Sequence, residues 1–507
     1  MYNEKKLHPL TLITEAYKRL ISFILPILFF AFTGPDMEGF GLILPLLFFT
    51  IFGLSYLVDV LRYIRTSFWI AGNRFVVKSG LFIQKEKDVQ ISRIQSIDYS
   101  ENLVHRIFNV TKLEIKTPGK GITLDALSKE DALKLANQLH YLKETSLDAN
   151  RDDSNEEREE KQIDRHSGFS LQEAGVTKKL YSMSLVDILK MNFMGGTVFK
   201  GLIIIVGAVN IFGEFIPDSI FNQAGTIFSQ TAIASFIFIG ILLFILLYVL
   251  ATVLSIIKNF EYKVELTKNH VTIEKGLLEV KSQTIALANI QSVWEKQNWL
   301  QKLTGYTTFW VGITSDDEVD KKDSVSEMTE EGKILLLPLV KKDQLAALRA
   351  EIIPQFNFQP AQTIIPIRSF RRFVQFPLLF WIIAAALVSY FLWPYAWTIG
   401  LVGSLLSLLY GYRSYKKTGY ALSTEEVTFQ LITFLGTEIM YLRKDRILNL
   451  TVKQNPFLRR SRLGKVEVFS ALGDTSQSKE LSFIEEADCE RLFDWFLTKE
   501  RSEKHGA

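Results

Sequence analysis

Basic side chains recur beside an asparagine at three places in this chain, and together they favour binding chemistry over bond-breaking chemistry. Lysines and arginines near a membrane surface attract anionic lipid headgroups, each contributing about 1 kcal/mol. The alternative for such residues is an ordinary solvated face. Each asparagine either contacts a ligand or hydrogen-bonds the backbone of a turn or cap. The residues are Asn102, Asn298 and Asn455, with Arg93, Arg106, Lys302, Lys444, Arg446, Arg459 and Arg460.

A short repeated motif precedes each asparagine. Ile94-Gln-Ser-Ile97 and Ile290-Gln-Ser-Val293 match closely, and Ile447-Leu-Asn-Leu450 is a weaker third copy. In every copy the asparagine follows seven residues after the second residue of the motif. We expect the repeated residues, namely Gln95, Gln291 and the three asparagines, to be structural.

The segments around each motif must form a small β domain closed by a helix. Alternating apolar residues flank a Ser-Gly or Lys-Gly turn, a pattern typical of β-hairpins. Ser128 and Asp131 form a capping-box pattern before the first closing helix. The closing helices are expected at 132–139, 342–348 and 486–496. Mostly antiparallel strands with one helix predict a small barrel or sandwich capped by that helix.

Three strongly apolar stretches without lysine or arginine predict three membrane hairpins. Each is long enough for two spans of roughly 20 residues and a short turn, so we expect a multi-pass membrane protein with six transmembrane helices. Basic residues concentrate on the cytoplasmic side of short loops. Both termini and all three β domains are therefore predicted to be cytoplasmic. The stretches run from Arg19 to Arg62, from Lys200 to Lys258 and from Arg372 to Arg413.

These features divide the chain into a unit repeated three times: a surface segment, a membrane hairpin and a β domain. A linker dense in charge, at 146–165, is expected to be disordered. The predicted surface or juxtamembrane segments are 1–19, 166–196 and 356–374. The predicted hairpins are 20–64, 197–257 and 375–412. The predicted β domains are 65–145, 258–355 with a polar insertion at 315–332, and 413–500.

Composition and motifs argue against several classes of function. The net charge of +3 gives no general attraction to nucleic acid, and a single Cys489 excludes an internal disulfide or a cysteine metal cluster. The sequence has no phosphate-binding loop, no His-Glu-x-x-His and no Gly-x-Ser-x-Gly. An enzyme is the least favoured class, and no catalytic residue, metal or cofactor is expected.

The repeated pattern resembles the bacterial pleckstrin-homology-like membrane family, of the YdbT type, over nearly the whole chain. The residues that carry the resemblance are Gly80-Leu81, Gly276-Leu277 and Gly436, together with the three motifs and their asparagines. The resemblance implies PH-like barrels with a C-terminal helix in a non-catalytic cytoplasmic-membrane protein. It also implies a smaller family member as a partner, and a role in envelope stress or antimicrobial resistance.

Two functions remain in competition at this point. The first is a scaffold whose hairpins hold three PH-like modules under the membrane, where they bind lipids, partner proteins or one another. The second is a lipid-handling or transport component whose helices enclose a path. Charged residues inside spans usually mark such a path, and the predicted spans contain only one clear case, Asp59, which we expect to pair with Arg62. Their scarcity favours the scaffold.

Overall fold

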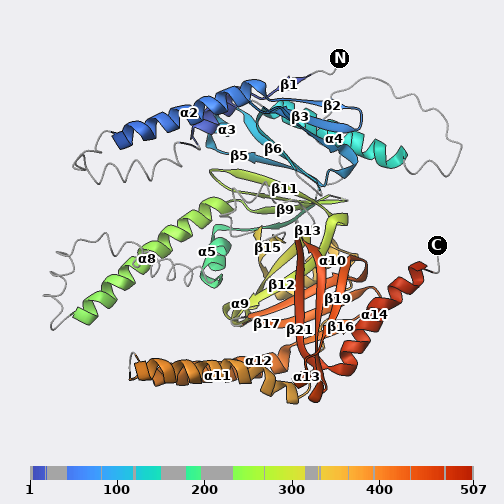
Figure 1. Cartoon of the computed structure of the whole chain (residues 1–507). Helices are drawn as coiled ribbons and strands as arrows, with labels where there is room; N and C mark the ends of the chain where they lie inside the picture. The colour runs from blue at the N-terminus through green and yellow to red at the C-terminus, as the bar shows by residue number, and fades with distance from the viewer. Residues whose placement is uncertain are drawn as a thin grey trace. The chain divides into compact units, whose positions relative to one another are not determined.

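The computed structural model describes a chain rich in antiparallel sheet that is divided into two compact units (Figure 1). The first unit comprises 1–178, 267–286 and 318–323, and the second comprises 179–266, 287–317 and 324–507. The described residues are 4–17, 19, 43–81, 83–117, 121–149, 178–195, 232–267, 269–313, 329–330, 333–362, 365–391, 394–433, 436–472 and 475–504.

The first unit packs two sheets around one core. One sheet has the order β1-β2-β3-β4, and the other contains β7-β6-β5-β11-β10. Phe75, Ile91, Leu113 and Leu124 are buried between the sheets, and helix α4 closes the core with Leu139. The strands are β1 (Lys5–Lys6), β2 (Ser67–Ala71), β3 (Arg74–Ser79), β4 (Lys85–Gln90), β5 (Ser96–Glu101), β6 (Val110–Lys116), β7 (Ile122–Ser128), β10 (His270–Lys275) and β11 (Val280–Ala286). The helices are α2 (Ile43–Arg65), α3 (Leu103–Ile107) and α4 (Lys129–Ala149), with a 3-10 turn η1 (Ile91–Arg93).

The second unit contains a sheet of order β14-β15-β13-β12-β18-β17-β16 and a smaller one of order β19-β20-β21. The strands are β8 (Lys178–Ser182), β9 (Lys263–Leu266), β12 (Ile290–Asn298), β13 (Tyr306–Ile313), β14 (Thr329–Glu330), β15 (Lys333–Lys341), β16 (Gly419–Leu422), β17 (Glu426–Thr433), β18 (Gly436–Arg443), β19 (Ile447–Lys453), β20 (Leu463–Leu472) and β21 (Thr475–Glu485). The helices are α5 (Leu185–Met194), α8 (Ala232–Asn259), α9 (Trp299–Thr304), α10 (Lys342–Ile352), α11 (Arg368–Phe391), α12 (Ala396–Lys417), α13 (Pro456–Arg460) and α14 (Glu486–Lys504), with 3-10 turns η4 (Leu287–Asn289) and η6 (Lys444–Arg446).

Sequence chemistry explains several of these elements. Ser128 is the residue before α4, and its hydroxyl accepts the backbone N–H of Asp131 at 3.1 Å and donates to the Asp131 carboxylate at 2.6 Å. The bond from the Asp131 N–H is one half of the predicted capping box. Proline lacks the N–H that a ladder needs, and Pro338 accordingly lies where the register of β15 shifts between its Val340–Thr307 and Leu337–Phe309 pairs.

The same order of elements occurs three times. In each repeat, three strands lead to a 3-10 turn, and an edge strand, a short helix, further strands and a closing helix follow. The 3-10 turns η1, η4 and η6 begin four residues before Gln95, Gln291 and Leu448. The edge strands β5, β12 and β19 are therefore equivalent, and so are β4, β11 and β18, which end directly before the turns.

The prediction of six transmembrane helices is wrong. Among the described helices, α11 alone is long and apolar enough to cross a membrane. The apolar run of α12 is interrupted by Gly400, Gly403 and Ser407. In α8 the described apolar stretch, Phe244–Asn259, is shorter than a span of roughly 20 residues. The predicted first and third spans, 20–34 and 197–212, lie outside the described residues, as does most of the linker at 146–165.

The helix α2 has a polar end, which also sets it apart from the predicted span. Its Asp59 is 6% exposed and forms ion pairs with Arg19 and, at 3.6 Å, with the expected partner Arg62. The helix then ends at Arg65. A charged pair of this kind shortens the apolar part of α2 that is available to span a membrane.

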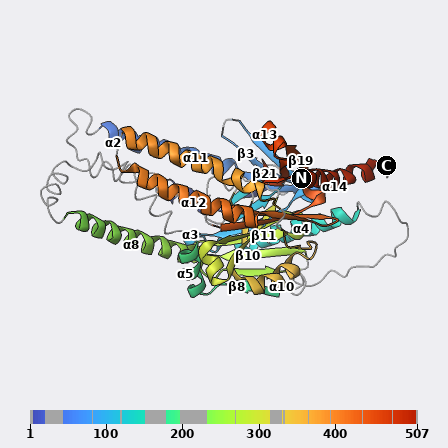
Figure 2. The same ribbon diagram turned by 90° about the horizontal axis from the view of Figure 1, so that it is seen from below.

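The helices α11 and α12 lie side by side in both views (Figures 1 and 2). Their seam is formed by small residues: an added Cβ at Gly403 would overlap the ring of Trp381, and one at Gly400 would overlap Ala385. Close packing through small residues is typical of helices in membranes. The opposite faces carry exposed large side chains such as Phe380 and Leu401.

The predicted closed barrels are also wrong, because the sheets that the described residues form are open and are shared between repeats. The edge strand β5 pairs with β11, and β12 pairs with β18, instead of closing onto a strand of their own repeat. A barrel removes its edges by closure, whereas these domains cover an edge with the next repeat.

Candidate functional site

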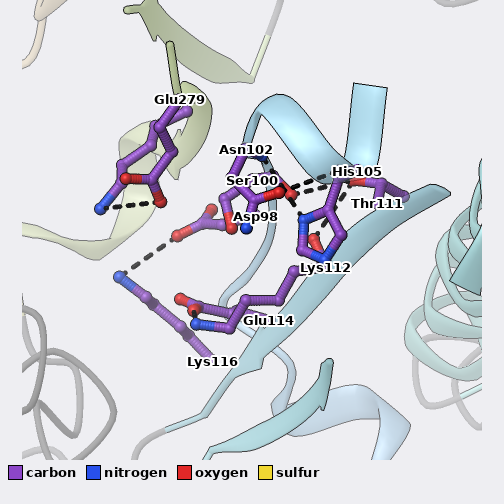
Figure 3. Close-up of polar contacts among 10 residues, drawn as sticks. Asp98, Ser100, Asn102, His105, Thr111, Lys112, Glu114, Lys116 and Glu279 are labelled. Atoms are coloured by element: carbon purple, nitrogen blue, oxygen red, sulfur yellow. Dashed lines mark hydrogen bonds and ion pairs between the residues drawn. The ribbon is translucent and has the colours of Figure 1, made fainter. Parts of the chain in front are cut away.

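The three repeat asparagines cap the short helices that carry the basic residues. Asn102 accepts the backbone N–H of His105 at 2.8 Å, and Asn455 accepts that of Leu458 at 2.8 Å. Figure 3 shows Asn102 and His105 facing each other at the start of α3. Asn298 is the N-cap of α9, and its backbone N–H donates to Gln301 at 2.8 Å. The asparagines therefore position the start of each short helix through hydrogen bonds that involve main-chain N–H groups.

Each short helix exposes apolar and basic side chains together. On α3, Ile107 is 76% exposed beside Arg106, and on α13, Phe457 is 71% exposed beside Arg459 and Arg460, which are also exposed. On α9, the exposed Leu303 follows Lys302. Exposed apolar residues with basic neighbours are typical of surfaces that lie against a membrane interface. In each unit separately, we call these helices with their side chains the short-helix surface of that unit.

Contacts in the second unit join parts of this surface to the apolar helices. Arg372, near the start of α11, donates to the Phe457 carbonyl at 2.8 Å and to the Ser461 hydroxyl at 3.0 Å. The helix α13 therefore lies beside the first turns of the one described helix that fits a span.

A cluster of like charges surrounds α9. A close contact with Lys417, then burial, then the charges of Arg413 and Lys342 lower the pKa of Lys302 to about 8. Arg413 and Lys417 belong to the last turns of α12. A group of cations that repel one another favours an anion nearby, such as a lipid phosphate.

The remaining predicted cations do not join the short-helix surface. Lys444 is buried, at 8% exposed, with its ammonium 5.0 Å from the centre of the Trp495 ring. Arg446 donates to the Ala288 carbonyl at 3.0 Å and so ties the third repeat to the turn η4 of the second. Arg93 is exposed at the end of η1.

The two motif glutamines lie at the start of equivalent edge strands. The backbone N–H of Gln95 donates to the Lys116 carbonyl at 2.8 Å. Gln291 is buried, and its side-chain amide donates to the Asn289 carbonyl at 3.3 Å. Both contacts lie within one repeat and hold the start of the strand against other residues of that repeat.

The joint between the first two repeats contains a buried ion pair. In the first unit, β5 pairs with β11 from Tyr99 opposite Ser282 to Glu101 opposite Val280. Beyond this ladder the Asp98 carboxylate accepts the Thr284 backbone N–H at 3.0 Å. It also lies 3.2 Å from the Lys116 ammonium, and Figure 3 draws this ion pair. Burial raises the pKa of Asp98, while the Lys116 charge and the Thr284 N–H oppose that shift.

The joint between the second and third repeats is longer. In the second unit, β12 pairs with β18 over seven positions, from Ser292 opposite Leu442 to Asn298 opposite Gly436. Arg349 of α10 forms an ion pair with Glu295 of β12 and donates to the Tyr441 hydroxyl of β18 at 3.1 Å. Its guanidinium also lies 4.7 Å from the centre of the Phe358 ring.

The residues of these joints are not among those predicted from the sequence. Asp98 and Glu295 are charged residues directly after the apolar residues Ile97 and Trp294 of the motif strands, and both are less than 8% exposed. A charge in such a strand is the signal that points to a buried partner. Within the described residues, no group of three or more His, Cys, Asp or Glu side chains is arranged to hold a metal ion.

Comparisons with known proteins agree with the threefold repeat. The bacterial PH domain matches the chain at residues 21–143, 203–355 and 368–500. The UPF0699 transmembrane protein YdbT of Bacillus subtilis (strain 168) is 24% identical over 519 aligned residues, covering 98% of each protein. The resemblance drawn from the motifs is confirmed. The chain belongs to the bacterial PH domain family and carries that domain three times.

Proposed function

We propose that this protein is a non-enzymatic membrane scaffold that presents three joined PH-like domains at the cytoplasmic membrane face for the docking of partner proteins. One observation carries the proposal: consecutive repeats share sheets through β5–β11 and β12–β18. Within each unit, this pairing holds a strand of one repeat against a strand of the next, which a flexible tether does not. A scaffold needs this property.

Attachment to the membrane is the second part of the proposal. It is supported by the apolar α11, by the contact of Arg372 with α13, and by the exposed apolar and basic side chains of the short-helix surface. Basic residues next to a span favour the cytoplasmic side, and Arg371 and Arg372 lie at the start of α11. The resemblance drawn from the motifs extends the proposal to protection against envelope stress.

The test is complementation of a strain that lacks the protein, challenged with a membrane-active antimicrobial peptide. Arg349→Ala should lose protection, because it breaks the ion pair with Glu295 at the β12–β18 joint. Arg368→Ala is the matched control, since its pair with Glu485 is exposed at 46% and 42%. The double variant Glu295→Gln, Arg349→Met should restore protection, because it leaves no buried charge unpaired.

Membrane levels of each variant are measured in the same cells. Limited proteolysis establishes whether Arg349→Ala has separated β12 from β18. If these strands are separated and the variant still protects fully at normal membrane levels, the scaffold is contradicted. Loss of protection that the double variant fails to restore would also contradict it.

A further inference from the structure

Two of the three equivalent edge strands are covered by the next repeat in the chain. The strand β5 receives β11, and β12 receives β18, both antiparallel. In each case the incoming strand is the one directly before the 3-10 turn of its own repeat. The same antiparallel strand pairing therefore occurs at both joints between consecutive repeats.

The third edge strand has no strand on that side among the described residues. The strand β19 ends the three-stranded order β19-β20-β21. Leu448 is 60% exposed, whereas the equivalent Gln291 under β18 is 7% exposed. Val452 is 39% exposed, whereas the equivalent Glu295 is 7% exposed. Apolar residues thus face solvent at positions that the docked strand covers in the second repeat.

We propose that the β19 edge docks an antiparallel β-strand from a separate protein, in the register of the β12–β18 joint. The proposal deepens the scaffold function and rests on it, because it names the surface on which a partner is held. Main-chain hydrogen bonds along an exposed sheet edge supply affinity, and alternate side chains supply specificity. An uncovered apolar edge is otherwise a site of aggregation.

The register specifies the chemistry of the incoming strand. Lys453 is equivalent to Lys296, which lies opposite Glu438 in the β12–β18 joint. Val452 is equivalent to Glu295, which lies opposite Ile439. Lys453 already forms an ion pair with Glu467 of β20, so an acidic residue opposite it would share that ammonium. The partner strand should therefore carry an acidic residue opposite Lys453 and an apolar residue next to it, opposite Val452.

A second copy of this chain fits the edge poorly. Its equivalent strand is β4, in which Lys85 occupies the position of Glu438 and Glu86 that of Ile439, as counted back from the turn. Lys85 would then face Lys453, and like charges directly opposite are destabilising. Lys85, Glu86, Lys87 and Asp88 are all exposed, and charges of this kind protect an edge against pairing.

The probe for the experiment is a synthetic peptide of residues 426–443, which contains β17 and β18 and carries Glu438 and Ile439. Fluorescence anisotropy measures its binding to the full-length protein in detergent micelles. Saturable binding is expected. The peptide with Glu438→Lys should bind roughly three- to tenfold more weakly, because a favourable cross-strand charge pair becomes a repulsive one.

Two protein variants locate the site. Leu448→Lys, Val452→Lys places charges on the edge and should abolish binding, and unchanged thermal unfolding checks that its fold is intact. The matched control is Glu86→Lys, which changes a charge on β4, an end strand of its own sheet, and should leave binding unchanged. Binding that survives the double variant, or no binding at all, would overturn the proposal.

Light scattering tests whether a second copy of this chain occupies the β19 edge. Self-association that Leu448→Lys, Val452→Lys removes would assign the edge to a second copy and overturn the proposal of a separate protein. The binding measurement uses no stress assay. Its failure would therefore leave the complementation result for the scaffold unaffected, and the two outcomes remain distinguishable.

Discussion

The guanidinium of Arg349 donates a hydrogen bond to the Tyr441 hydroxyl at 3.1 Å and so links the closing helix of the second repeat to strand β18 of the third. Both side chains lie in one network with Glu295. Burial, together with the Glu295 charge, raises the pKa of Tyr441 above its usual value. The phenol therefore stays protonated at physiological pH, and its oxygen remains available as an acceptor.

Removal of this guanidinium should be costly. Arg349→Ala leaves Glu295, at 8% exposed, without its counter-charge. Breaking one partner of a buried pair costs about 3–5 kcal/mol, and the partial exposure of Arg349 places the expected loss near the lower figure. Chemical unfolding of the detergent-solubilised protein measures it. Arg368→Ala should lose less than about 1 kcal/mol, and an equal loss in both variants would show that the network is not a joint.

The buried Asp98 predicts a pH dependence of the first joint. Its raised pKa means that the folded protein holds this proton more tightly than the unfolded chain does. Its contribution is therefore fully present below the ordinary value of 3.8 and is lost as pH rises through the folded pKa. The stability of the wild type relative to Asp98→Asn should fall as pH rises over that interval. A relative stability that increases with pH would mean that Lys116 dominates.

The caps of the short helices can be tested one at a time. Asn455→Ala removes the acceptor of the Leu458 N–H, and loss of an N-cap costs about 1 kcal/mol. Hydrogen exchange of residues 456–460 should become faster. Asn455→Asp keeps an acceptor and should exchange like the wild type. If Asn455→Ala exchanges no faster than Asn455→Asp, the asparagine is not acting as a cap.

The basic side chains of α13 should respond to lipid charge. In nanodiscs containing phosphatidylglycerol, residues 456–460 are expected to exchange more slowly than in nanodiscs of phosphatidylcholine. Arg459→Ala, Arg460→Ala should remove the difference, since each charge contributes about 1 kcal/mol. Arg74→Ala, on an exposed pair in β3 with Asp88, serves as the control. Equal protection in both lipids would identify α13 as an ordinary solvated surface.

Local patterns predicted the elements better than they predicted how those elements meet. The capping box at Ser128 and the closing helices were readable because their signals lie within a few residues. Lys444 was expected on an open face but lies over Trp495, which is distant in sequence. The pairing of β12 with β18 depends on which edge each repeat leaves open. The hydrophobic pattern of a single strand does not predict which strand will pair with it.

The membrane prediction failed for a related reason. The prediction relied on long stretches without basic residues, a feature that α12 shares with α11. In α12, however, Gly400, Gly403 and Ser407 reduce the hydropathy. Gly400 and Gly403 instead form the seam against Trp381 and Ala385. Small side chains that permit close helix packing contribute little to the apolar signal on which span prediction relies.

The central claim, that consecutive repeats are joined by paired edge strands, is tested most directly by disulfide formation across β12 and β18. Lys296 lies opposite Glu438, and cysteines at directly paired positions meet the distance requirement of about 7 Å or less between Cα atoms. With Cys489 replaced by Ser, the Lys296→Cys, Glu438→Cys variant should form an intramolecular disulfide under mild oxidation, detected by mass spectrometry of proteolytic peptides. Lys296→Cys, Arg443→Cys is the control, since Arg443 lies five positions further along the strand than Glu438. No disulfide in the first variant, or equal amounts in both, would contradict the joint.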